Sequence, residues 1–230
     1  MKKKNIIFVA EIGMNSDGIF ANNEKLIKAA KFAGADIAKF QLGWRDDQSD
    51  INYLDHKRVK MLFEWGKKYK IEIMFSIIKP YAFEIIKKFK IKRYKIASRT
   101  VIEYPNLVKK ILKEKKETFI SLGWWKKNYF PFKNSNAKYL FCVSNYPTIH
   151  SDLIKMPKKF NNYFGYSDHV IGLEACFMAI SRGANLVEKH FTLNKDSKVI
   201  RDHALSATPD EFKILVDQGR KIYELNNEIS

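Results

Sequence analysis

The stretch that decides the fold begins with Ile6-Ile-Phe-Val-Ala-Glu-Ile12, continues through Asn22-Asn-Glu-Lys-Leu-Ile-Lys-Ala-Ala-Lys-Phe-Ala33 and ends with Asp36-Ile-Ala-Lys-Phe-Gln-Leu42. The first and third pieces are short runs rich in β-branched and aromatic residues, which predict strands. The middle piece carries apolar residues three and four apart, as an amphipathic helix does. This order of elements indicates a strand, a covering helix and a second strand of an α/β protein.

The same alternation continues along the chain without a Pro-rich or Ser-rich linker. The predicted strands are Ile6 to Ile12, Asp36 to Leu42, Ile71 to Ile77, Tyr94 to Ser98, Thr118 to Leu122, Tyr139 to Ser144, Tyr163 to Ser167 and Leu186 to Phe191. The predicted helices are Asn22 to Ala33, Asp55 to Tyr69, Tyr81 to Lys88, Tyr104 to Lys115, Leu173 to Arg182 and Pro209 to Leu225. Eight alternations predict a single (β/α)₈ TIM barrel over residues 1–230. A doubly wound open sheet is the alternative, because pattern alone does not establish closure.

The composition is that of a folded domain, with 46% hydrophobic residues and a net charge of +17. Most of the basic residues are lysines scattered through predicted helices, a pattern typical of a solvated surface rather than of a nucleic-acid footprint. The excess charge is expected to attract small anionic substrates. No apolar run reaches eighteen residues, and the start, Met1-Lys-Lys-Lys-Asn5, resembles no signal peptide. We therefore expect no membrane span. Because the chain has only two cysteines and no C-x-x-C pattern, we expect a reducing, cytoplasmic location.

Polar side chains stand at the carboxyl end of every predicted strand, where the active sites of barrels lie. They are Glu11, Lys39, Gln41, Ser76, Lys95, Ser98, Ser121, Ser144, Asn145, Tyr146, Ser167, Asp168, His169, Glu188, Lys189 and His190. A lysine inside a barrel must find an anion or shift its pKa, because an unpaired buried ammonium is costly. Lys39 and Lys95 therefore indicate a phosphate or carboxylate ligand, unless they lie on the outward face and reach past the helices.

Two histidines end neighbouring predicted strands. Barrel closure would bring His169 and His190 to the same part of the rim. Two neutral imidazoles, completed by water or carboxylate, suit Mn²⁺, Fe²⁺, Co²⁺ or Zn²⁺. Without the barrel, capping or core hydrogen bonding would be the favoured interpretation of this pair.

Five motifs carry a resemblance to a known family. They are Glu11-Ile-Gly-Met-Asn-Ser-Asp-Gly18, Ala33-Gly-Ala-Asp-Ile-Ala-Lys-Phe-Gln41, Gly165-Tyr-Ser-Asp-His169, Val187-Glu-Lys-His-Phe-Thr192 with Asp202-His203, and Pro209-Asp-Glu-Phe212. In this order and spacing the sequence resembles the barrel domain of the N-acetylneuraminate (sialic acid) synthase family. The resemblance implies condensation of phosphoenolpyruvate with an aldose, an N-acetylated amino sugar, to a 2-keto sugar acid with release of phosphate.

The resemblance also implies roles for the residues at the strand ends. Glu11, His190 and Asp202 would be catalytic, and His169 and His190 would bind a divalent metal, usually Mn²⁺, with Mg²⁺ or Co²⁺ as alternatives. The substrate-binding set would be Lys39, Gln41, Ser76, Lys95, Ser98, Arg99, Ser121, Ser144, Tyr146 and Ser167. Neither nucleic acid nor a membrane is expected as a partner.

The sequence departs from the family pattern at several places. Ser16 replaces a histidine, Ile77 replaces a hydroxyl-bearing residue expected near the phosphate, and Thr100 replaces a carboxylate expected to hold the acceptor sugar. Arg99 beside it, with Arg45, predicts an anionic acceptor. The family's C-terminal antifreeze-like domain has no counterpart, so a homodimer mate or another chain is expected to supply its contribution. The alternative function is a catalytically weakened barrel that binds a ligand or regulates a partner.

Overall fold

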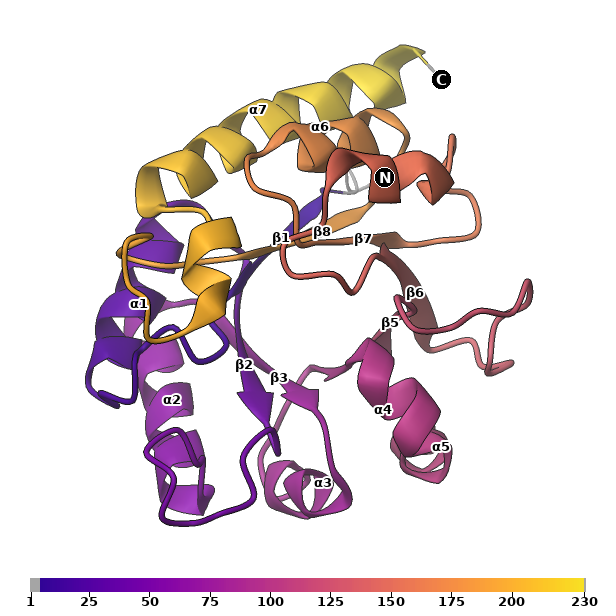
Figure 1. Ribbon diagram of the computed structural model, residues 1–230. Helices are drawn as coiled ribbons and strands as arrows, with labels where there is room; N and C mark the ends of the chain where they lie inside the picture. The colour runs from indigo at the N-terminus through magenta and orange to yellow at the C-terminus, as the bar shows by residue number, and fades with distance from the viewer. Residues whose placement is uncertain (1–4, 230) are drawn as a thin grey trace.

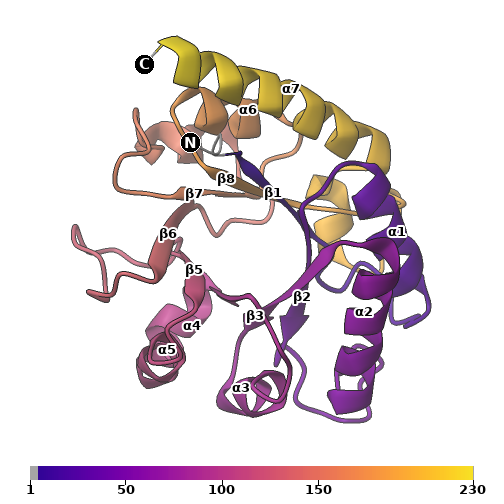
Figure 2. The same ribbon diagram turned by 180° about the vertical axis from the view of Figure 1, so that it is seen from behind.

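The computed structural model, which describes residues 5–229, contains a closed barrel of parallel strands in chain order, with the first strand paired to the last. Figure 1 looks into this ring, and Figure 2 shows it from behind. The strands are β1 (Ile7–Glu11), β2 (Ile37–Leu42), β3 (Glu72–Ile77), β4 (Arg93–Ile96), β5 (Glu117–Ser121), β6 (Ala137–Cys142), β7 (Gly165–Asp168) and β8 (Leu186–His190). The predicted TIM barrel is confirmed and the open sheet is excluded. The predicted features at Met1–Lys4 and Ser230 lie outside the described residues.

The barrel interior is apolar toward the amino ends of the strands and polar toward their carboxyl ends. Its floor is a cluster of six buried side chains, Val9, Ile37, Met74, Phe119, Leu140 and Leu186. Alternate residues of a strand face the same side, so the residue two positions further along also points inward. In five of these six strands that second residue is polar or charged, namely Glu11, Lys39, Ser76, Ser121 and Glu188, and in the sixth it is Cys142. The sequence thus builds a hydrophobic plug and sets a polar layer directly on it.

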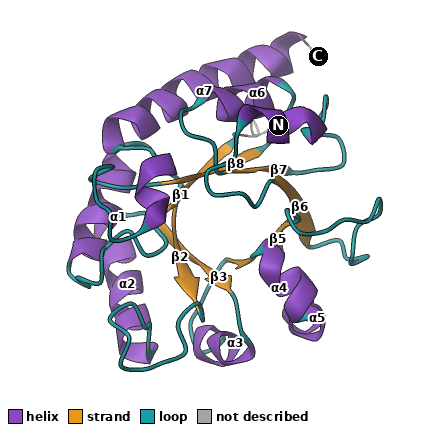
Figure 3. Cartoon of the chain, in the orientation of Figure 1, coloured by secondary structure: helices purple, strands orange, loops and turns teal. Residues whose placement is uncertain are grey.

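Helices cover the outside of the barrel (Figure 3). They are α1 (Asn22–Phe32), α2 (His56–Tyr69), α3 (Pro80–Ile86), α4 (Ser98–Glu103), α5 (Pro105–Leu112), α6 (Glu174–Ser181) and α7 (Pro209–Ile229), with 3₁₀ turns η1 (His150–Lys155) and η2 (Arg201–Leu205). The predicted start of the last helix is confirmed: the Thr208 hydroxyl accepts from the Glu211 amide at 3.4 Å, and the Glu211 carboxylate accepts from the Thr208 amide at 2.8 Å. This reciprocal capping satisfies two amides that a helix end otherwise leaves unpaired.

The expected helices differ from the observed ones on one side of the barrel. The predicted helix Tyr104 to Lys115 is confirmed as α5, with slightly shorter bounds. The helix α4 before it was not predicted, and it begins at Ser98, where the predicted strand Tyr94 to Ser98 was expected to end. The two helices are separate because Pro105 disfavours helical backbone at Tyr104 (φ −132°, ψ 54°). None of the six predicted helices lies after β5 or β6. In the structure, residues 122–136 form a loop after β5, and only η1 forms after β6. The predicted strand Tyr163 to Ser167 is shifted, since β7 spans Gly165–Asp168.

None of the helices described in residues 5–229 combines the length and the apolar character needed to cross a lipid bilayer.

Candidate active site

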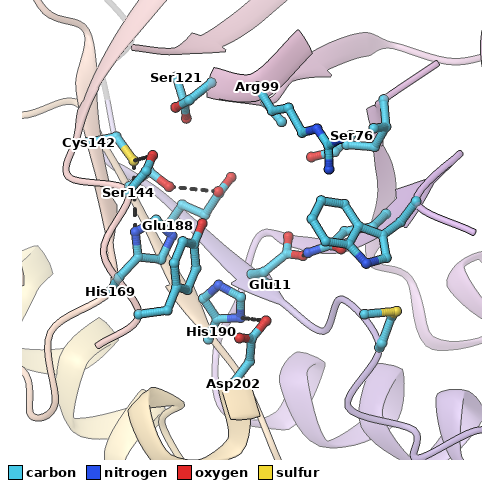
Figure 4. A pocket seen from close by; sticks show the side chains of 18 of the residues that line it. Glu11, Ser76, Arg99, Ser121, Cys142, Ser144, His169, Glu188, His190 and Asp202 are labelled. Carbon is cyan, nitrogen blue, oxygen red and sulfur yellow. Dashed lines mark hydrogen bonds and ion pairs between the residues drawn. The ribbon is translucent and has the colours of Figure 1, made fainter. Parts of the chain in front are cut away.

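A cavity of about 740 Å³ opens at the carboxyl ends of the strands (Figure 4). Every residue to which the family resemblance gives a role in the site lines it, whereas Asp168 and Lys189, also noted at the strand ends, do not. Those with such a role are Glu11, Lys39, Gln41, Ser76, Lys95, Ser98, Arg99, Ser121, Ser144, Tyr146, Ser167, His169, His190 and Asp202. The barrel therefore brings fourteen residues from a span of 192 positions to one concave surface. Their chemical roles stay predictions.

A chain of buried charges forms the bottom of the cavity. Lys39 makes an ion pair with Glu11 and lies 3.4 Å from the Glu188 carboxylate, which in turn lies 3.5 Å from Lys95. All four side chains are nearly fully buried. The lysines face the interior, so the alternative in which they point outward past the helices is wrong. They differ in their surroundings, because Lys95 has only the longer carboxylate contact.

Burial and pairing oppose each other in the pKa values of these groups. Burial lowers the pKa of Lys39, but attraction to Glu11 and Glu188 outweighs it and leaves the pKa raised. Burial also lowers the pKa of Lys95, and there the pull of Glu188 does not restore it. Burial raises the pKa of Glu11 against the opposing influence of Lys39. Lys95 is thus the cation with the least compensated charge in the cavity.

The serines at the strand ends hold or face these charged groups. Ser76 Oγ accepts from Lys39 Nζ at 3.0 Å, and Ser121 Oγ accepts from Lys95 Nζ at 2.8 Å. Ser167 donates to Glu188 at 2.9 Å, while Ser98 Oγ accepts from the Gly123 amide at 2.8 Å. The hydroxyls fix the ammonium groups in place and offer further hydrogen bonds to an oxyanion.

Two imidazoles stand beside the buried charges. The rings of His169 and His190 are 5.4 Å apart between centroids. His169 Nδ1 lies 2.7 Å from the Val143 carbonyl oxygen, an acceptor, so Nδ1 donates a hydrogen bond to it and Nε2 is the nitrogen that faces a ligand. Burial lowers the pKa of His190 well below its usual range, and the positive charges near it act in the same direction. His190 Nδ1 is buried without a hydrogen-bond partner and lies 3.8 Å from the Asp202 carboxylate.

This pair fits a metal ion bound by few protein ligands. Metal ligands must be neutral imidazoles with a free lone pair. The lowered pKa of His190 favours the neutral ring. Burial lowers the pKa of His169, but Cys142 and the Val143 carbonyl outweigh it and leave the pKa raised, so a metal bound at Nε2 would displace a proton there. Within residues 5–229 no cluster of three or more His, Cys, Asp and Glu side chains is arranged to hold a metal. Two protein ligands leave the remaining positions to water or substrate, the open arrangement of a catalytic rather than a structural ion.

The outer wall of the cavity is aromatic and basic. Gln41 donates to Glu11 at 3.2 Å, and Tyr146 packs over His169 with ring centroids 4.1 Å apart. The Arg201 guanidinium lies 4.7 Å above the Tyr146 ring and 3.3 Å from Asp202. Aromatic faces and planar donor groups of this kind suit a polyhydroxylated ligand with one apolar face.

Arg99 lies on this wall, but not as an unpaired cation. Its Nε donates to Glu103 at 2.7 Å, and its guanidinium lies 5.6 Å above the Trp44 ring. The side chain is 42% exposed. The neighbouring Thr100, expected in place of an acceptor-binding carboxylate, is instead buried and donates to the main-chain carbonyls of Ile77 and Ile78. Thr100 is not among the lining residues.

Sequence reasoning gave no role to several residues of the cavity. Glu188 is the main omission, because it links both lysines. Its position two residues after Leu186 and two before His190 places it on the inward face, a signal that the sequence contains. Trp44 and Trp124 stand on loops whose course only the fold reveals.

Together these features define a closed parallel barrel with a buried, mixed-charge pocket and an adjoining imidazole pair at its carboxyl end. The NeuB family model matches residues 44–229, and the chain belongs to that family. The pseudaminic acid synthase of Campylobacter jejuni is 32% identical over 95% of this chain and 74% of its own length. The N,N'-diacetyllegionaminic acid synthase of the same organism is 28% identical over 95% of this chain and 77% of its own length. The crystal structure of N-acetylneuraminic acid synthetase from Leptospira borgpetersenii, in complex with citrate, has the same fold, with a TM-score of 0.83 and 24% identity over 96% of this chain and 85% of that one.

Proposed function

We propose that this protein condenses phosphoenolpyruvate with an aldose to give a 2-keto sugar acid and inorganic phosphate, in the biosynthesis of a surface polysaccharide or glycan. The observation that carries the proposal is the pair of buried lysines facing one cavity with two adjacent imidazoles. Two synthases of nonulosonic sugar acids among the relatives support the same reaction class. In the reaction, carbon 3 of phosphoenolpyruvate bonds to the aldehyde carbon, whose oxygen takes up a proton and becomes a hydroxyl. A water oxygen bonds to carbon 2 and loses its protons, the bond between carbon 2 and the phosphate oxygen breaks, and carbon 2 becomes the keto group as inorganic phosphate leaves.

Lys39 and Lys95 would bind the carboxylate and phosphate of phosphoenolpyruvate. Charge-assisted hydrogen bonds in a dry site are the strong ones, and the serine hydroxyls already hold both ammonium groups in place. Glu11, 1% exposed, lies beside Lys39 and Gln41 and would exchange a proton or stabilise charge near the reacting carbons. Burial raises the pKa of Glu11 against the attraction of Lys39, which makes this carboxylate a better proton acceptor than an exposed one.

His169 and His190 would hold a divalent cation, Mn²⁺ in first place and Mg²⁺ or Co²⁺ as alternatives. Bound there, the ion would act as a Lewis acid that polarises the aldehyde of the acceptor. Asp202, beside His190, would orient the acceptor hydroxyl or water on that side of the cavity.

The acceptor would be an N-acetylated amino sugar or a related, anionic sugar. Arg99 and Arg45 line the outer cavity, and both have carboxylate neighbours, Glu103 at 2.7 Å and Asp50 at 3.4 Å. Arg99 uses its Nε for Glu103, which leaves its two terminal amino groups to reach a ligand oxygen. We propose a homodimer mate or another chain as a further partner of this site. We place the enzyme in the cytoplasm, where phosphoenolpyruvate is made.

The alternative is a catalytically weakened barrel that binds a ligand or regulates a partner. Its main support was the loss of polar groups at Ile77 and Thr100. Ile77 packs in the outer hydrophobic core and Thr100 bonds to main-chain carbonyls, so neither change removes a charged group from the cavity floor. This favours the enzyme.

The experiment is a measurement of phosphate release from phosphoenolpyruvate by the purified chain with Mn²⁺ and a panel of aldoses. The proposal expects release that depends on an aldose and stops when the ion is chelated. A Glu11→Gln variant serves as the matched control, since it keeps the size of the side chain and removes its charge. Binding of phosphoenolpyruvate without release for any aldose would favour the regulatory barrel.

A further inference from the structure

A second buried ion pair lies directly behind the imidazoles. Asp168 and Lys189 are opposite each other in the register of β7 and β8, and their charged groups are 2.6 Å apart. Their side chains are 0% and 1% exposed, and they face α6 on the outside of the barrel. Each immediately precedes a cavity histidine, His169 or His190.

The Asp168 carboxylate has a complete set of donors. It accepts from Tyr166 Oη at 2.6 Å, from the Val170 amide at 3.1 Å and from Cys176 Sγ at 3.4 Å, in addition to Lys189. Lys189 Nζ also donates to the Val170 carbonyl oxygen. The ammonium group therefore bonds to residues on both sides of His169, and the carboxylate closes a tight turn over it.

The backbone of His169 has little other support on this side. β7 ends at Asp168, so its ladder with β8 stops one residue before the histidine. On the opposite side, the Thr148 amide donates to the His169 carbonyl oxygen at 2.9 Å. The β7–β8 ladder ends at the Asp168 and Lys189 pair, and the ion pair adds a side-chain link from the strand carrying His190 to both residues that flank His169.

A buried ion pair is an energetically unfavourable way to pack a barrel against a helix. Removing two charges from water costs several kcal/mol for each ion, and well-packed apolar residues of similar size are often neutral or stabilising replacements. A role in stability alone does not account for charges at this position. Groups behind metal-binding imidazoles orient them, and changing those groups typically weakens metal binding about 10- to 100-fold.

We propose that Asp168 and Lys189 are positioning residues that set the spacing and direction of His169 and His190. The inference rests on the metal site of the proposed function. Because side chains alternate along a strand, a tie between residues 168 and 189 on the outer face fixes the backbones from which the two imidazoles project inward (Figure 4).

The test compares Mn²⁺ binding and thermal unfolding in the full chain. The double variant Asp168→Asn with Lys189→Met removes both charges and keeps both side-chain sizes, and Asn still accepts from Tyr166. We expect it to fold and to bind Mn²⁺ about 10- to 100-fold more weakly, with a changed electron paramagnetic resonance spectrum of the bound ion. The matched control, Arg93→Met with Glu72→Gln and Glu117→Gln, removes the ion pairs that Arg93 makes with these two glutamates, at 2.8 and 2.6 Å, at the other end of the strands. It should leave Mn²⁺ affinity unchanged.

The outcomes separate this inference from the proposed function. If the unmodified protein binds no Mn²⁺, the metal site of the proposed function fails. If it binds Mn²⁺ and the folded double variant binds equally well, the positioning role is overturned. If the double variant does not fold, the Mn²⁺ affinity of a Lys189→Arg variant tests the positioning role instead. That variant keeps the charge but replaces a compact ammonium with a planar fork, and unchanged Mn²⁺ affinity in it would also overturn the role.

Discussion

Replacing Lys95 with methionine should weaken phosphoenolpyruvate binding without unfolding the barrel. Methionine keeps the length of the stem and removes only the ammonium group. A hydrogen bond to a charged group contributes about 1.5–3 kcal/mol, which corresponds to a loss of about 10- to 150-fold in affinity. The folded state should tolerate the change, because Glu188 keeps Lys39 at 3.4 Å and the Ser167 hydroxyl at 2.9 Å.

The same substitution at Lys39 should have a different effect. Lys39 is the ion-pair partner of both Glu11 and Glu188, so its removal strips two buried carboxylates of their nearest cation. Breaking a buried pair in this way costs about 3–5 kcal/mol. For a chain of this size, each kcal/mol lowers Tm by about 2–4 °C. Lys39→Met should therefore lose both phosphoenolpyruvate affinity and a large part of its thermal stability.

Isothermal titration calorimetry with phosphoenolpyruvate and a thermal unfolding scan measure the two effects. A Ser121→Ala variant is the control, since it removes a partner of Lys95 but no charge. Affinity unchanged in Lys95→Met would refute the reasoning, because it would mean that the least compensated ammonium of the cavity touches no ligand. Equal losses of stability in the two lysine variants would refute the assignment of the carboxylates to Lys39.

Three further predictions follow from the structure. Replacing His169 and His190 together with alanine should abolish stoichiometric Mn²⁺ binding measured by elemental analysis, and full retention would remove both from the metal site. Arg99→Ala should lower phosphate release with phosphorylated aldoses more than with neutral ones, whereas best turnover with a neutral sugar, insensitive to the mutation, would reject an anionic acceptor. Gly165→Ala should lower Tm, since a Cβ there would meet the Leu186 carbonyl oxygen at 2.3 Å and overpacking costs about 1–3 kcal/mol; an unchanged Tm would show that β7 and β8 can separate without cost.

The barrel could be predicted because each strand has a recognisable local sequence pattern. Short β-branched runs alternate with amphipathic stretches, and helix starts such as Thr208 carry their own capping residues. The course of the loop after β5 could not be predicted in the same way, because aromatic contacts between residues of different segments form the barrel wall there. Phe130 stacks on Tyr139 at 4.3 Å between ring centroids, and Tyr163 packs edge-on against Phe130 at 5.4 Å. Such contacts leave no periodic signal.

The site could be predicted as a set of positions but not as a set of partners. Strand ends place Lys39 and Lys95 in one cavity, yet their pairing through Glu188 depends on the closure of the barrel, which sets β8 beside β1. The sequence predicted an external anion for the two lysines. In the structure the carboxylates of Glu11 and Glu188 pair with these lysines, so a substrate anion would compete with them for the ammonium groups.

The alternation of inward and outward side chains also explains why the departures from the family motifs at Ile77 and Thr100 change the cavity so little. Ser76 and Ile77 are neighbours on β3, so one faces the cavity and the other the outer core. A change at Ile77 therefore alters helix packing rather than the ligand shell. Thr100 lies on α4, where its hydroxyl caps the end of β3 by bonding to the Ile77 and Ile78 carbonyls. The cavity therefore keeps the charged floor of β1, β2, β4 and β8 and the imidazole pair. Burying four charges is costly even when they pair with one another, so their place at the carboxyl end of the barrel favours a ligand-binding role over a purely structural one.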